Sequence, residues 1–156
     1  MPLPSVGGRL TFQGMVAPVS SAPLLIVEDD ADILEALQAY LELHGYAVRV
    51  ARNGREALEQ LALSPRPSLM VLDMALPVMD GHRVLTTRKT SEALAQVPVI
   101  ILSAGMVTMS ARDRAVYAAS YNVAAFLKKP VEPRQLLEAI ERLASRPEGA
   151  QTGMPP

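Results

Sequence analysis

Short apolar runs alternate with longer stretches of mixed polarity over most of the chain. The runs at residues 24–27, 69–72 and 99–102 are continuous, which is typical of strands buried on both faces of a parallel sheet. Weaker runs at residues 47–50 and 124–127 predict two further strands. The arginine within the first of these favours an edge strand with one face in water. The pattern therefore predicts five strands, with the three continuous runs at the centre.

Amphipathic helices are predicted between the strands, because apolar residues recur there every three or four positions. We expect Gly45 to follow the first helix and Asn53 to precede the second. Ser110 begins a capping box, and Asn122 is expected to end that helix in a left-handed conformation. A further helix lies somewhere in residues 82–95, where the pattern is weakest. The clearest stripes are Ile33, Leu37, Tyr40 and Leu41, then Ala57, Leu58 and Leu61, and finally Leu136, Leu137, Ile140 and Leu143.

Repeated strand–helix units predict an α/β domain with a doubly wound parallel sheet and helices on both faces. Right-handed crossovers bring the carboxyl ends of all strands to one edge, where ligands bind in such sheets. The first strand ends in the acidic run 28–30, the third in Asp73, the fourth in Ser103 and the fifth in residues 128–130, which include Lys129. The pattern therefore predicts that carboxylates, a hydroxyl and an ammonium group meet at this edge.

Carboxylates gathered at one point repel each other unless a cation lies between them. An all-oxygen set of ligands favours a hard ion such as Mg²⁺ over zinc or copper. An acidic run such as residues 28–30 is, on its own, more often a solvated turn. Its position directly after a buried strand favours a magnesium site instead.

Composition limits the other classes of function. The chain has 156 residues, 49% of them hydrophobic and 20% charged, as expected of one soluble globular domain. A net charge of −1 provides no global basic field for nucleic acid or an anionic membrane. The absence of cysteine excludes disulfides and zinc–thiolate sites, and no apolar run approaches the roughly 20 residues of a membrane helix. We therefore expect a cytoplasmic protein without nucleic-acid or membrane partners.

The two ends of the chain are rich in Pro, Gly or Ser and lack periodicity. We expect flexible tails at residues 1–22 and 147–156, and one domain over residues 23–146. The segment TFQGM at residues 11–15 also has the form that a protease-cleavable tag leaves behind, so the first tail has two interpretations.

Four motifs in order resemble the response-regulator receiver family. They are LIVEDD at 25–30, VLDMALPVMDG at 71–81, VPVIILSA at 97–104 and FLKKP at 126–130. The resemblance covers nearly all of residues 24–143. It implies a five-stranded parallel sheet in the flavodoxin-like order 2-1-3-4-5, and a two-component signalling switch rather than an enzyme acting on a small-molecule substrate.

The resemblance also implies a role for each residue of the acidic edge. Asp73 accepts the phosphoryl group, while Glu28 and Asp29 hold Mg²⁺ together with Asp73 and the backbone carbonyl of Ala75. Mn²⁺ is expected to substitute for Mg²⁺. Asp30 is expected to lie outside the metal's immediate ligands.

Phosphoryl transfer depends mainly on positioning and on neutralising the charge of the phosphoryl oxygens. By resemblance, Ser103 and Lys129 contact those oxygens. Movement of Ser103 toward the phosphoryl group then vacates space for the switch aromatic, Phe126. This change shifts the surface built from the fourth helix, fifth strand and fifth helix of the family, as a population shift between two states.

The implied phosphodonor is a histidine kinase or a histidine phosphotransfer protein, and the implied target is a protein that the sequence does not identify. We expect a stand-alone receiver, and dimerisation through the output surface remains open. One alternative is a receiver-like interaction module that acts without phosphorylation. A phosphatase with an aspartate nucleophile would normally carry a second aspartate two residues after Asp73, where this chain has Ala75.

Three features complete the sequence-based picture. The segment 105–121 is longer between the hydroxyl and the lysine than is usual in the family, so borrowed output contacts are not transferred to it. Ala75 and Gly105 are nearly bare where side chains govern water access, so the lifetime of a phosphorylated state is not predicted. His44 and His82 have no metal-ligand partner at helical spacing and are interpreted as structural.

Overall fold

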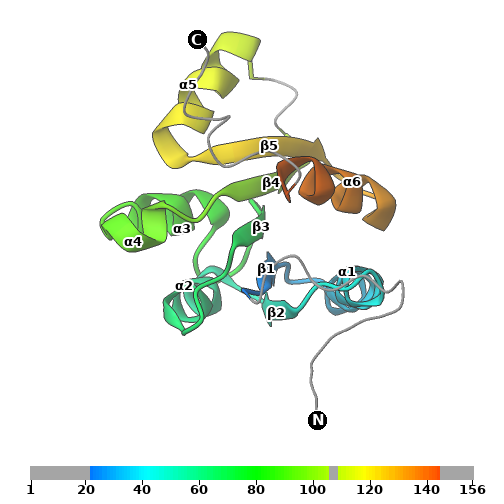
Figure 1. Ribbon diagram of the computed structural model, residues 1–156. Helices are drawn as coiled ribbons and strands as arrows, with labels where there is room; N and C mark the ends of the chain where they lie inside the picture. The colour runs from blue at the N-terminus through cyan, green and yellow to red at the C-terminus, as the bar shows by residue number, and fades with distance from the viewer. Residues whose placement is uncertain (1–21, 106–108, 145–156) are drawn as a thin grey trace.

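The computed structural model describes residues 22–105 and 109–144, which form one five-stranded sheet with helices around it (Figure 1). The strands pair in the order β2-β1-β3-β4-β5, and every pair is parallel. The predicted fold class and strand order are therefore confirmed. Apart from Ala22, the tails expected at 1–22 and 147–156 lie outside the described residues. The strands are β1 (Leu24–Val27), β2 (Val48–Ala51), β3 (Leu69–Asp73), β4 (Val99–Ser103) and β5 (Val123–Lys128).

Two predicted strand ends that matter for the site agree with the structure. Asp73 and Ser103 are the last residues of β3 and β4. The reason is that parallel pairing continues to the edge of the sheet, where Asp73 is registered with Leu102 and Ser103 with Lys128. Both side chains are therefore placed by the sheet itself.

Helix ends follow the predicted capping signals closely. The side chain of Asn53 accepts the N–H of Glu56, and Ser110 accepts the N–H of Asp113. Asn122 has φ 56° and Gly45 has φ 95°, as the left-handed termini require. The helices are α1 (Ala31–Leu43), α2 (Gly54–Ala62), α3 (Gly81–Arg88), α4 (Glu92–Ala95), α5 (Ala111–Tyr121) and α6 (Pro133–Ala144).

Two helix predictions require correction. The segment 82–95 contains two helices, because Ser91 accepts the N–H of Leu94 and starts α4 after α3 has ended. In α1, Ile33 is 39% exposed, whereas Leu34 is buried together with Leu37 and Leu41. The stripe was predicted one residue too early at its first position.

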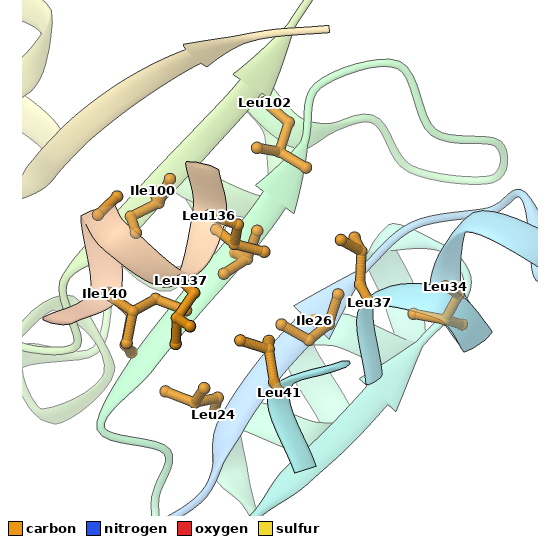
Figure 2. Close-up of a cluster of buried hydrophobic side chains, with 13 residues drawn as sticks. Leu24, Ile26, Leu34, Leu37, Leu41, Ile100, Leu102, Leu136, Leu137 and Ile140 are labelled. Atoms are coloured by element: carbon orange, nitrogen blue, oxygen red, sulfur yellow. The ribbon is translucent and has the colours of Figure 1, made fainter. Parts of the chain in front are cut away.

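Two hydrophobic layers cover the faces of the sheet. Helices α1 and α6 lie on one side, and α2, α3 and α4 lie on the other (Figure 1). Figure 2 shows the first layer, in which leucines of α1 and α6 meet the apolar side chains of β1 and β4. Helix α5 lies beside edge strand β5 and differs from the long helices of both layers, because none of its residues is buried.

Candidate functional site

The carboxyl ends of β1 and β3 bring three carboxylates together. Val27 is registered with Leu72 in the adjacent strand, so the next residue of each strand, Glu28 and Asp73, emerge side by side. Both are buried, each with 1% of its surface exposed, whereas Asp29 is exposed. One oxygen from each of the three carboxylates lies within 4.8 Å of the other two. The acidic cluster predicted from the sequence therefore exists.

Lys129 provides the positive charge at this edge. Its Nζ donates to Oδ2 of Asp73 at 3.0 Å and to Oε1 of Glu28 at 3.4 Å. Its backbone N–H donates to the carbonyl of Ser103 at 3.2 Å, which fixes the lysine against the end of β4. One ammonium group thus donates hydrogen bonds to two buried carboxylates at the ends of different strands.

Backbone N–H groups satisfy the remaining oxygens of the two buried carboxylates. Oε2 of Glu28 accepts the N–H of Asp30 at 3.1 Å, and Oδ1 of Asp73 accepts the N–H of Ala75 at 3.1 Å. The side chain of Asp30 turns away to cap α1, where it accepts two backbone N–H groups. This separates Asp30 from the carboxylate cluster.

The carboxylates at the site outnumber the ammonium group that faces them. Burial raises the pKa of Glu28, and the charge of Asp73 adds to this against the opposing effects of the Asp30 N–H and Lys129. Burial alone would lower the pKa of Lys129, but its contacts with Asp73 and Glu28 outweigh burial and raise that pKa. Three carboxylates and one ammonium leave net negative charge among oxygen donors. This donor set fits a hard divalent ion such as Mg²⁺ or Mn²⁺.

Ser103 lies at the same edge of the sheet as the cluster, and Phe126 lies on β5, registered with Ile101 of β4. Ser103 ends the strand adjacent to β3, and its Oγ accepts the N–H of Gly105 at 3.1 Å. Phe126 is half-buried, with its ring centroid 6.5 Å from that of Tyr117 on α5. The hydrogen bond of the Ser103 side chain is thus within its own loop, and the contacts of Phe126 include α5.

The role of Gly81 was not recognised from the sequence. A Cβ atom on Gly81 would lie 2.8 Å from the carbonyl oxygen of Asp73 and 2.7 Å from the sulfur of Met74. Its backbone N–H donates to the Met74 carbonyl at 3.1 Å. In the sequence, an aspartate followed by glycine indicates only a turn and gives no indication of such close packing.

Comparison with known proteins agrees with this geometry. Residues 24–141 match the response regulator receiver domain, and the chain belongs to that family. It is 36% identical over 128 residues to the transcriptional regulatory protein PrrA of Mycobacterium leprae, covering 82% of this chain and 52% of that protein. It is 35% identical over 126 residues to the probable transcriptional regulator ycf29 of Pyropia yezoensis, covering 81% of this chain and 54% of that protein. The chain thus spans about half the length of these curated relatives.

Solved structures show the same likeness. The signal receiver domain of a signal transduction histidine kinase from Syntrophus aciditrophicus is 32% identical, with a TM-score of 0.67 over 86% of this chain and 98% of that one. Receiver domains are signalling switches of two-component systems rather than enzymes for small-molecule substrates. Within the described residues, no helix has both the length and the apolar character needed to cross a membrane.

Proposed function

We propose that this domain is a phosphoacceptor switch that receives a phosphoryl group on Asp73 from a histidine kinase or a histidine phosphotransfer protein. The observation that carries the proposal is the environment of Asp73. This carboxylate is buried, lies 3.0 Å from the ammonium group of Lys129, and shares a cluster within 4.8 Å with Glu28 and Asp29. A carboxylate needed only for folding would not require two further carboxylates beside it.

Transfer in this proposal forms a bond between phosphorus and a carboxylate oxygen of Asp73 while the bond from phosphorus to the donor's imidazole nitrogen breaks. The imidazole leaves with the electron pair of that bond and takes up a proton. Lys129 already donates to Oδ2 of Asp73 and is placed to donate to a phosphoryl oxygen instead. Glu28, Asp29, Asp73 and the carbonyl of Ala75 would hold Mg²⁺ or Mn²⁺, which when bound supplies positive charge toward the phosphoryl oxygens.

Ser103 and Phe126 are proposed to convert this chemistry into a change of shape. Ser103 would exchange its contact with the N–H of Gly105 for one with a phosphoryl oxygen, since the new group offers strong acceptors beside the end of β4. Phe126 would then reposition against α5 and alter the surface presented to a downstream protein. A second copy of the chain remains a candidate partner for that surface.

Mass spectrometry after treatment with acetyl phosphate tests the proposal. In the presence of Mg²⁺ we expect the wild type to gain one phosphoryl group, and Asp73→Asn to gain none. Excess chelator should abolish the adduct. Asp113→Asn, which removes an exposed carboxylate on α5, is the matched control and should be modified like the wild type.

Metal binding is tested separately by titrating Mg²⁺ against the unmodified protein and following unfolding. Mg²⁺ at about ten times its Kd should stabilise the wild type by about 1.4 kcal/mol. Asp73→Asn should lose most of this gain. A wild type that gains no phosphoryl group under any condition would instead favour an interaction module that acts without phosphorylation.

A further inference from the structure

A hydrogen bond connects helix α3, which follows the acceptor loop, to helix α5. Nδ1 of His82 lies 2.8 Å from the hydroxyl oxygen of Tyr117, a residue 35 positions later in the chain. The His82 ring also stands edge-on to Tyr121, with the two centroids 5.6 Å apart. The histidine therefore contacts two successive turns of α5.

The acceptor side of this contact is rigid. Gly81 immediately precedes His82, donates its N–H to the Met74 carbonyl at 3.1 Å, and has no room for a Cβ beside the Asp73 carbonyl. Asp80 caps the same helix through the N–H of Arg83 at 2.9 Å. The position of the His82 backbone is thus fixed relative to the phosphoacceptor strand.

The α5 side of the contact is held less firmly than a core helix. Helix α5 has no fully buried residue, and Tyr117, Ala118 and Tyr121 are only partly buried against the second hydrophobic layer. Its carboxyl end is fixed, because Arg88 donates to the Tyr121 carbonyl and Asn122 donates to the Gln96 carbonyl at 3.0 Å. Further toward its middle, Tyr117 contacts both His82 and Phe126, the latter at 6.5 Å between ring centroids.

We propose that the His82–Tyr117 hydrogen bond is a latch that holds α5 in its unphosphorylated position and thereby opposes activation. His82 is a positioning residue in this account, acting on the output helix through Tyr117. The part of this inference that concerns activation rests on the proposed function. Tyr117 packs against Phe126, the proposed switch aromatic. A movement of the Phe126 ring therefore changes the packing that holds Tyr117 beside His82. Breaking the latch costs free energy. That cost reduces the free energy with which phosphorylation favours the active position of α5.

Hydrogen exchange of the α5 amides tests the latch in the unmodified protein. Tyr117→Phe keeps the ring and removes the hydroxyl, and His82→Gln removes the imidazole. Each should accelerate exchange in α5 by about two- to tenfold, the range expected for one hydrogen bond. The double variant should exceed either single variant only slightly, because both substitutions remove the same contact. By linkage, beryllofluoride with Mg²⁺ should bind each variant tighter by a similar factor.

Tyr40→Phe is the matched control. Tyr40 also stacks on a histidine, His44, at 4.6 Å between centroids, but it lies on α1 across the sheet from α2, α3 and α4. This control should leave both α5 exchange and beryllofluoride affinity unchanged. Equal behaviour of Tyr117→Phe and Tyr40→Phe would overturn the latch. A wild type that binds no beryllofluoride would overturn the proposed function instead, while the exchange comparison would still decide whether the contact holds α5.

Discussion

Helices α5 and α6 come before and after the same edge strand, β5, yet different interactions hold them. Helix α6 buries Leu136, Leu137, Ala139 and Ile140 against α1 and the sheet (Figure 2). Helix α5 has no fully buried residue and is held by the partial burial of Tyr117, Ala118 and Tyr121, a capped amino end, and polar contacts at its carboxyl end. One helix belongs to the core, while the other is attached to it.

The difference matters because the two kinds of attachment respond differently to a small displacement. A buried apolar stripe contributes about 25 cal/mol per Å² of buried surface and cannot shift without opening the core. Hydrogen bonds at the surface contribute only about 0.5–1.5 kcal/mol each and can be exchanged for others. A helix held in the second way can adopt two positions at low cost, as a signalling surface requires.

Substitutions on the two helices should therefore have very different effects on unfolding. We expect Leu136→Ala to lower the free energy of unfolding by about 2–5 kcal/mol, because it leaves a cavity in the apolar layer that α1 and α6 form with the sheet. Val116→Ala on α5, where the valine is 59% exposed, should change it by less than about 0.5 kcal/mol. Urea denaturation measures both. A comparable loss at Val116 would show that α5 belongs to the core after all.

The carboxyl end of α5 should be the exception, because a buried arginine fixes it. Arg88 is 2% exposed and donates to the carbonyls of Leu94 at 2.9 Å and Val97 at 2.7 Å, as well as to that of Tyr121. Burial lowers its pKa, but a guanidinium remains protonated in proteins. Arg88→Met keeps the apolar bulk and removes the hydrogen bonds from the guanidinium, so we expect a loss of about 2–4 kcal/mol in the free energy of unfolding.

Arg134 offers the matched control for Arg88. It is exposed on α6 and pairs with Glu138 at 3.5 Å. Arg134→Met should change the free energy of unfolding by less than about 0.5 kcal/mol, as is usual for an exposed ion pair on a helix. If Arg88→Met proved equally mild in urea denaturation, the fixed end of α5 would lose its main support and the helix would be mobile along its whole length.

The contrast between the two helices also explains how far the sequence could predict the fold. Continuous apolar runs placed β1, β3 and β4, and strong periodicity placed α6, since burial leaves a clear pattern in both cases. The residues 82–95 were predicted as one helix because Ser91 gives only a local capping signal within a weak pattern. Local capping interactions divide that region into two helices, and the spacing of its apolar residues does not reveal them.

The candidate site was predictable to the extent that it depends on the sheet. Strand order brings Glu28, Asp73 and Lys129 together, and their types and positions after apolar runs are visible in the sequence. Contacts between separate loops and helices leave no such signal. The pairing of His82 with Tyr117 depends on where α5 lies against α3, which no period or motif reports.

Alkaline titration tests the attachment of α5 through Tyr117, and we expect it to give the smallest of the three changes in the free energy of unfolding. Burial, followed by the proximity of Tyr121 and Asp80, raises the pKa of Tyr117 to about 12, above the unfolded value of about 10. The folded state therefore retains the phenolic proton more strongly. This contribution to stability is complete below pH about 10 and is lost as the pH rises toward 12.

Tyr117→Phe has no such proton, so its free energy of unfolding should fall less than that of the wild type between pH about 9 and 11. Because other titrating groups are common to both proteins, the difference between their urea transitions isolates Tyr117. Equal slopes would show that its hydroxyl is solvated like that of the unfolded chain, and the attachment of α5 through this residue would then be weaker than its contacts indicate.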